Sequence, residues 1–172
     1  NTKMIRIIHG EIWSKDFTQL DKLCKDFSSC TRFAFNRFQK ERLERNDVRN
    51  LAKWQYKSLN VNQVFDAVLL AEGMFTRFGK QKVIFGSKNL WNKLKSHKIT
   101  KEEFNFHKDG QMYSRGRAAR AGNVSLRVVD KNLRVAMGNR QFVSYKLFIS
   151  KKFQEELQWM FHLKCAYNVR LI

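Results

Sequence analysis

The chain reads VSLRVVDKNLRVAMGNRQFVSYKLFI from Val124 to Ile149. Apolar and polar residues alternate through much of this stretch, and a period of two is typical of half-buried strands. Turn-forming residues interrupt it at Asp130-Lys131-Asn132 and at Gly138-Asn139. The pattern therefore predicts three strands joined by short turns, at 124–129, 133–137 and 142–149.

Further short strands are expected on both sides of these three. Their segments are 3–13, 83–85, 111–115 and 167–172. Several short strands at close spacing are typical of a small barrel. Together with the helices described next, they predict an α+β fold built around such a barrel.

A helical region interrupts the strand pattern after its first member. Apolar residues recur at three- and four-residue steps through about 16–45, and Asp16 and Gln19 have the spacing of a capping box. We therefore expect a first strand within 1–15, a helical insertion at 16–78, and the rest of the barrel in 79–172. The other helices are expected at 47–59, at 61–78 after the capping pair Asn60 and Gln63, at 88–95 after Ser87, at 101–108 after Thr100, and at 151–163.

The composition is strongly basic. The 172 residues include 34 Lys and Arg against 15 Asp and Glu, a net charge of +19, yet 43% are hydrophobic and 13% aromatic. A chain this apolar can bury a core, which argues against intrinsic disorder. A compact body with so much positive charge is best tolerated beside a polyanion.

The chain carries no sign of a membrane or disulfide-bonded protein. It has no apolar run of membrane-spanning length, and its three cysteines lack C-x-x-C spacing. We expect a cytoplasmic protein with reduced thiols and no membrane contact.

The positive charge is concentrated between residues 79 and 129, where 12 basic residues stand against three acids. Trp91, Phe104, Phe106 and Tyr113 are interleaved with them. Basic side chains neutralise phosphates and exposed aromatic rings accept stacked bases, so this segment predicts a nucleic-acid-binding surface. The alternative is a solvated basic face whose aromatic residues belong to the core.

No catalytic or metal-binding pattern is found. Two-metal phosphodiester hydrolysis needs several converging carboxylates, whereas the acids here mostly stand beside basic neighbours. The four histidines and three cysteines lack the spacing of metal ligands. We expect no enzymatic activity and no cofactor within this chain.

Four blocks of sequence carry a resemblance. They are CTRFAFNRF at 30–38, FGSKNLW at 85–91, QMYSRG at 111–116 followed by Gly122-Asn123, and KKFQEEL at 151–157 followed by YNVRLI at 167–172. In this order they resemble the N-terminal part of TnpB, the transposon-encoded RNA-guided DNA endonucleases related to type V CRISPR effectors. Two departures are Arg115, where an aliphatic residue is usual, and Cys165-Ala166, where a proline-containing turn is usual.

The resemblance implies a wedge domain, an oligonucleotide-binding-like β-barrel, with a helical recognition domain inserted after its first strand. It implies guide RNA and target DNA as partners. It also implies a longer parent polypeptide, active in transposition, whose RuvC nuclease domain and divalent metal lie outside this chain. The apolar end at 169–172 agrees with a fragment, because an unpaired apolar strand invites association.

The resemblance and the charge pattern together name the candidate contacts. Arg32, Asn36 and Arg37 are expected to face nucleic acid from the first long helix. Asn60, Asn62 and Gln63 are expected to read base edges of a short DNA motif, since amide side chains pair with adenine; the equal alternative is a helix cap with solvent-facing amides. Phosphate contacts are expected from Lys82, Lys88, Lys93, Arg115, Arg117 and Arg120.

Two other functions stay open at this point. A nuclease-dead relative acting as an RNA-guided repressor would have the same sequence features in this region. An unrelated basic RNA-binding structural module would be expected to lack the helical insertion at 16–78.

Overall fold

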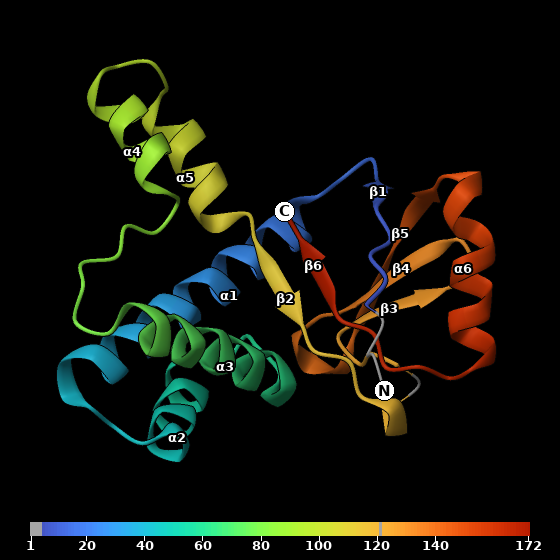
Figure 1. Cartoon of the computed structure of the whole chain (residues 1–172), viewed down its shortest axis with the longest axis horizontal. Coiled ribbons are helices and arrows are strands. Elements are labelled where there is room, and N and C mark those ends of the chain that lie inside the picture. The colour runs from blue at the N-terminus through green and yellow to red at the C-terminus, as the bar shows by residue number, and fades with distance from the viewer. Residues whose placement is uncertain (1–4, 121) are drawn as a thin grey trace.

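The structure is a computed structural model that describes residues 5–120 and 122–172. The α-helices of this part are α1 (Thr18–Asn36), α2 (Arg45–Gln55), α3 (Val61–Phe78), α4 (Lys88–Lys95), α5 (Lys101–Asp109) and α6 (Lys151–His162). The strands are β1 (Gly10–Trp13), β2 (Met112–Ser114), β3 (Leu126–Val129), β4 (Asn132–Ala136), β5 (Phe142–Ile149) and β6 (Val169–Leu171). The fold is α+β, as predicted, with α2, α3 and α4 on one side of the molecule and the sheet on the other (Figure 1).

Four strands form one antiparallel sheet in the order β1-β5-β4-β3, and β2 pairs separately with β6. Within the described residues, β1 bonds to β5 and β3 bonds to β4, so the edges do not meet and the sheet is open. The predicted small barrel is therefore not shown. Closure needs long, tilted and staggered strands, whereas β1 and β3 have four residues each.

The first strand is shorter than the predicted 3–13. Its pairing begins with Gly10 opposite Ile149, the last residue of β5, and residues 5–9 pair with none of the described strands. Ile5 and Ile7 are accordingly exposed. Lys3 and Met4 lie outside the described residues.

The helical core forms chiefly between α1 and α3. Leu20, Phe27 and Ala34 recur on the buried face of α1, and Val64 and Val68 meet them from α3. The apolar periodicity predicted this face correctly. Within residues 5–120 and 122–172, none of the helices combines the length and the apolar content needed to cross a bilayer.

The α-helical part of the first helix ends at Asn36, earlier than predicted. One π-helical segment, Arg37–Glu41, follows it directly. Arg42 then takes a left-handed conformation with φ of 53°, which ends the helix. The predicted capping box of Asp16 and Gln19 is wrong: Asp16 instead accepts hydrogen bonds from the backbone and hydroxyl of Thr18.

The predicted strand at 83–85 is also absent from the described structure. Phe85 packs its ring edge-on against Phe35 of α1, with the two centroids 5.6 Å apart. The apolar residues of this segment are thus explained by contact with the helical core.

Candidate nucleic-acid interface

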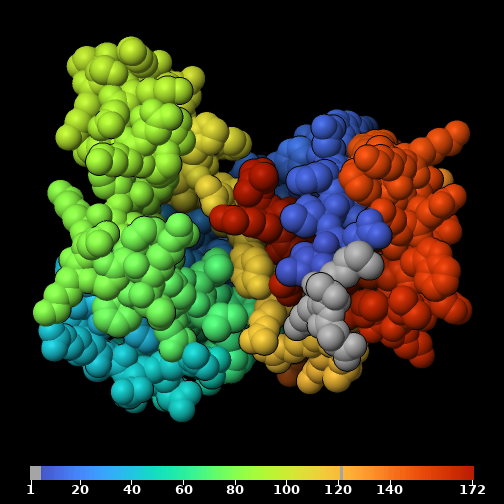
Figure 2. Space-filling view, in the orientation of Figure 1, coloured from blue at the N-terminus to red at the C-terminus, as the bar shows by residue number. Residues whose placement is uncertain are grey.

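A lysine-rich projection, residues 80–108, stands out from the body of the molecule (Figures 1 and 2). We call it the lysine arm. Its helices begin as predicted: the Ser87 hydroxyl accepts from the Leu90 amide, and Thr100 and Glu103 form a capping box. Its exposed lysines are Lys80, Lys82, Lys88, Lys93, Lys95, Lys98 and Lys101.

These lysines have no acidic partner in the part of the chain that the structure describes. The ion pairs found there all involve arginines: Arg6, Arg32, Arg37 and Arg45. The arm holds eight lysines against two acids, Glu102 and Glu103, so it presents a net positive charge to solvent. Such charge attracts a polyanion, because each phosphate neutralised releases condensed counterions.

The aromatic residues interleaved with this charge mostly do not face solvent. Phe104 is buried, and Trp91 and Tyr113 are half-buried. The rings of Trp91 and Phe104 lie 5.6 Å apart and hold α4 against α5. The prediction of exposed stacking rings is wrong for these three, and Phe106 alone of the four is exposed.

A second basic surface follows β2. We call residues 115–120 the arginine loop, and its Arg115, Arg117 and Arg120 side chains are all exposed. Its backbone is firmly held: Gly116 donates to the Asn168 side chain at 2.8 Å, and Arg117 donates to the carbonyl of Gly122 at 2.9 Å.

Gly122 explains how tightly this loop packs. It has φ of +90°, and a Cβ there would lie 2.3 Å from the ring of Tyr167. Only glycine fits such a backbone and such a contact. The loop thus combines a fixed backbone with guanidinium groups that point into solvent.

A buried carboxylate lies behind the arginine loop. Asp66 of α3 is 4% exposed, and its Oδ2 accepts from the Arg115 amide at 3.2 Å. Burial raises the pKa of Asp66 to about 6, although the Arg115 hydrogen bond and the charges of Arg117 and Arg115 act in the opposite direction. Asp66 was not among the site residues predicted from the sequence. The feature that could have identified it is an acidic residue within the apolar stripe 64–68.

Replacing Asp66 with Asn is expected to stabilise the protein above pH 6. Because the native carboxyl binds its proton more tightly than the unfolded one, wild-type stability falls as pH rises from 3.8 to about 6. The amide lacks this ionisation, so the gain near pH 7.5 should be about 1–2 kcal/mol after allowance for solvent screening. Urea denaturation at several pH values measures it.

The matched control is Asp47→Asn, which changes an exposed aspartate on α2. The D47N protein keeps Asp66, so its stability should still fall as the pH rises from 3.8 to about 6. A D66N variant less stable than wild type at pH 7.5 would show that the ionised carboxylate helps to hold the loop.

The candidates on the first helix already have partners in the fold. Arg32 pairs with Asp109 at 2.9 Å, and both side chains are largely buried. Arg37 pairs with Glu41 and lies over the ring of Phe33. Both guanidinium groups therefore have a partner within the fold, Asn36 beside them is half-buried, and contact of the three with nucleic acid stays a prediction.

The amide candidates of α3 turn out to be structural. Asn60 and Gln63 form a capping box, which confirms the helix cap of the alternative but not its solvent-facing amides, because Gln63 is buried. Gln63 has no exposed surface, and its Nε2 donates to the carbonyl of Ala136 at 2.7 Å. The prediction that Gln63 reads a base edge is therefore wrong. Asn62 is half-buried, and its role stays a prediction.

The structure thus separates the predicted phosphate contacts into two surfaces. Lys82, Lys88 and Lys93 belong to the lysine arm, and the three arginines belong to the arginine loop. The two surfaces lie at opposite ends of β2 (Figure 1). A ligand that contacts both must therefore extend along the molecule.

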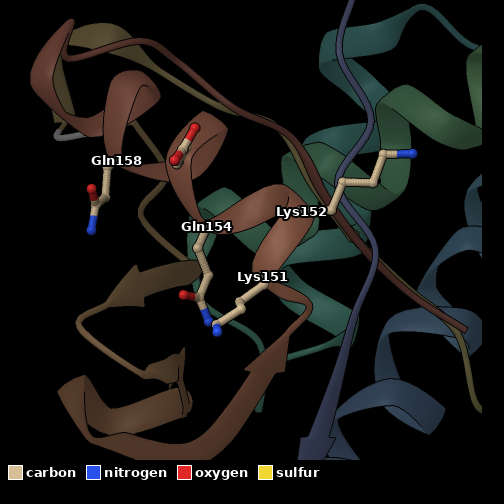
Figure 3. A pocket seen from close by; sticks show the side chains of 5 residues that line it. Lys151, Lys152, Gln154 and Gln158 are labelled. Carbon is tan, nitrogen blue, oxygen red and sulfur yellow. The ribbon is translucent and has the colours of Figure 1, made fainter.

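A hollow whose lining includes Ala118, Arg127 and Tyr167 adjoins the arginine loop. The hollow in Figure 3 is lined by Lys151, Lys152, Gln154, Glu155 and Gln158, all from α6, and Lys152 points away from Lys151 and Gln154. Among the described residues, no three His, Cys, Asp or Glu side chains lie close enough together to hold a metal ion.

Comparison with known proteins gives one match. The sequence model of the family described as SSO2105 N-terminal domain matches residues 7–172. No curated protein and no solved structure matches the chain.

Proposed function

This chain belongs to the SSO2105 N-terminal domain family, and we propose that it binds structured RNA through the lysine arm and the arginine loop. One observation carries the proposal: the exposed cations of both surfaces form no ion pair with any described residue. Their positive charge is therefore available to a polyanion.

The two surfaces suit different parts of the RNA backbone. The arm's lysines are flexible point charges that follow phosphates without fixed geometry. The arginines stand on a fixed backbone, and each guanidinium can bind a phosphate through two parallel hydrogen bonds. Phosphate contacts of this kind recognise the shape and charge of the RNA and do not distinguish one base sequence from another.

We further propose that this RNA is the guide scaffold of a TnpB-like RNA-guided endonuclease, acting in the cytoplasm. The pairing of β1 with β5 supports this, because the chain leaves the sheet after β1 and passes through α1–α5 before returning. The segment FGSK at 85–88 also supports it, because it resembles a Phe-Gly-Gly-Lys block of that family. Gly86 and Ser87 have φ values of 91° and 84°, a backbone that suits glycine at both positions.

The other properties implied by the resemblance to TnpB are also part of the proposal. They comprise the wedge barrel, the contact with target DNA, and a parent polypeptide that supplies the nuclease domain with its divalent metal. No step of DNA cleavage is assigned to the residues described here. A nuclease-dead parent would use the same RNA-binding surfaces.

Binding of an RNA hairpin at increasing salt tests the RNA-binding proposal. If about six phosphates are neutralised, affinity should fall roughly 1,000-fold between about 50 and 200 mM salt. Fluorescence anisotropy with a labelled hairpin measures the slope. An affinity that stays constant over this range would contradict electrostatic RNA binding.

A further inference from the structure

One face of the four-stranded sheet has no covering element in the contacts described. Successive side chains of a strand point to opposite faces, and Leu133 and Tyr145 point into the core. We call the other side the sheet face. Its residues are Glu11 and Trp13 of β1, Phe142, Ser144, Lys146 and Phe148 of β5, Asn132, Arg134 and the buried Ala136 of β4, and Arg127 and Val129 of β3.

Three large aromatic residues of the sheet face are open to solvent. Trp13 is 49% exposed, Phe142 51% and Phe148 58%. Exposed apolar side chains scattered singly need no explanation, but rings gathered on one face mark an interaction site. Phe142 and Phe148 stand six residues apart on β5, so the rings span about 20 Å.

Cations lie directly beside these rings. The Arg134 guanidinium is 4.5 Å from the centroid of the Phe142 ring, and the Lys146 ammonium is 5.7 Å from that of Trp13. Neither cation forms an ion pair within the described part of the chain, and Glu11 is the single acid of the face. Rings interleaved with free cations match the alternating bases and phosphates of a single strand.

The sheet face also adjoins the arginine loop. Arg127 of β3 donates through Nη2 to the carbonyl of Arg120 at 3.1 Å. A strand leaving an RNA duplex bound at the loop would therefore reach β3 first and then cross the sheet.

We propose that the sheet face binds unpaired RNA, with bases stacked on Trp13, Phe142 and Phe148 and phosphates held by Arg134 and Lys146. A guanidinium plane packed on a ring is itself a stacking surface for a base. The span of the rings accommodates about four nucleotides. This site is distinct from the lysine arm and the arginine loop.

Binding of a labelled oligouridine of about 12 nucleotides tests the proposal, because this ligand forms no duplex. Replacing Trp13, Phe142 and Phe148 together with Ala should weaken its binding at least tenfold in fluorescence anisotropy. The control replaces Trp54 and Trp159 with Ala; these rings are at least as exposed as those of the sheet face, and they lie outside the sheet, the lysine arm and the arginine loop. The control should bind like wild type.

This design distinguishes failure of the sheet-face proposal from failure of the proposed binding of structured RNA. Substituting the three arginines of the loop with Ala should weaken hairpin binding more than oligouridine binding, while the sheet variant should do the reverse. If the sheet variant binds oligouridine as tightly as wild type, the sheet-face proposal is overturned and hairpin binding is unaffected. Loss of self-association in the sheet variant, with oligouridine binding unchanged, would overturn it in favour of contact between two copies.

A second measurement does not depend on how the alanine variant folds. In a protein carrying Trp54→Phe, Trp91→Phe and Trp159→Phe, Trp13 is the sole tryptophan. Stacking of a base on Trp13 should quench its fluorescence as oligouridine is added, with a midpoint equal to the anisotropy midpoint. Binding without quenching would overturn the placement of RNA on this face.

Discussion

Replacing Arg115, Arg117 and Arg120 together with Ala is expected to weaken binding of an RNA hairpin roughly 100-fold. Charge-assisted hydrogen bonds to phosphate are the strong ones, and about 1 kcal/mol lost at each arginine gives a total near 3 kcal/mol. The fold should survive, because the side chains are exposed and the loop is held through its backbone. Anisotropy gives the affinity, and urea denaturation should show a stability change below about 1 kcal/mol.

The control for this variant removes the same charge elsewhere. Lys40, Lys53 and Lys57 are exposed on the π-helical segment, on α2 and just after α2. Replacing them with Ala lowers the net charge equally and should cost only a few-fold in affinity. Equal losses in both variants would mean that overall charge, and not the arginine loop, drives binding; unfolding of the loop variant would mean that these arginines are structural.

Replacing Gln63 with Ala is expected to destabilise the protein by about 3 kcal/mol. The change removes the hydrogen bond to the Ala136 carbonyl, leaves that buried acceptor unsatisfied, and opens a cavity. It also breaks the capping box with Asn60. Urea denaturation measures the loss of unfolding free energy. The loss is large because the Gln63 side chain joins α3 to β4.

Asn60→Ala separates the two contributions of Gln63. It removes the side-chain acceptor of the capping box but leaves the bond to Ala136, so it should cost only about 1 kcal/mol. If Gln63→Ala leaves stability unchanged and instead alters nucleic-acid binding, the structural role of Gln63 is wrong and the base-reading role returns.

Local sequence patterns predicted most of the elements well. The capping pairs at Asn60 and Thr100 both form, and β5 spans the predicted 142–149. These features depend on contacts within a few residues, which a sequence displays directly. The false capping box at Asp16 shows the limit, because the Thr18 hydroxyl and backbone compete for the same carboxylate.

The candidate site was predicted less completely than the fold. Ten of the twelve basic residues at 79–129 are exposed, and Lys108 and Arg127 are half-buried. The sequence did not reveal the ion-pair partners of Arg32 and Arg37. A basic residue on a helix has the same local pattern whether its acidic partner lies nearby or far along the chain, and Asp109, the partner of Arg32, lies 77 residues away. Nor does any local pattern place Asp66 behind the arginine loop.

The sequence by itself determined the charge, the apolar faces of the helices, and the alternation that makes the strands. The tertiary structure alone decided which aromatic residues are buried and which cations are free. Trp91 and Phe104 pack between α4 and α5, whereas Phe142 and Phe148 alternate onto the uncovered side of β5. The reason is physical: exposure depends on what the rest of the chain brings to a surface, and that arrangement comes from contacts between residues far apart in sequence.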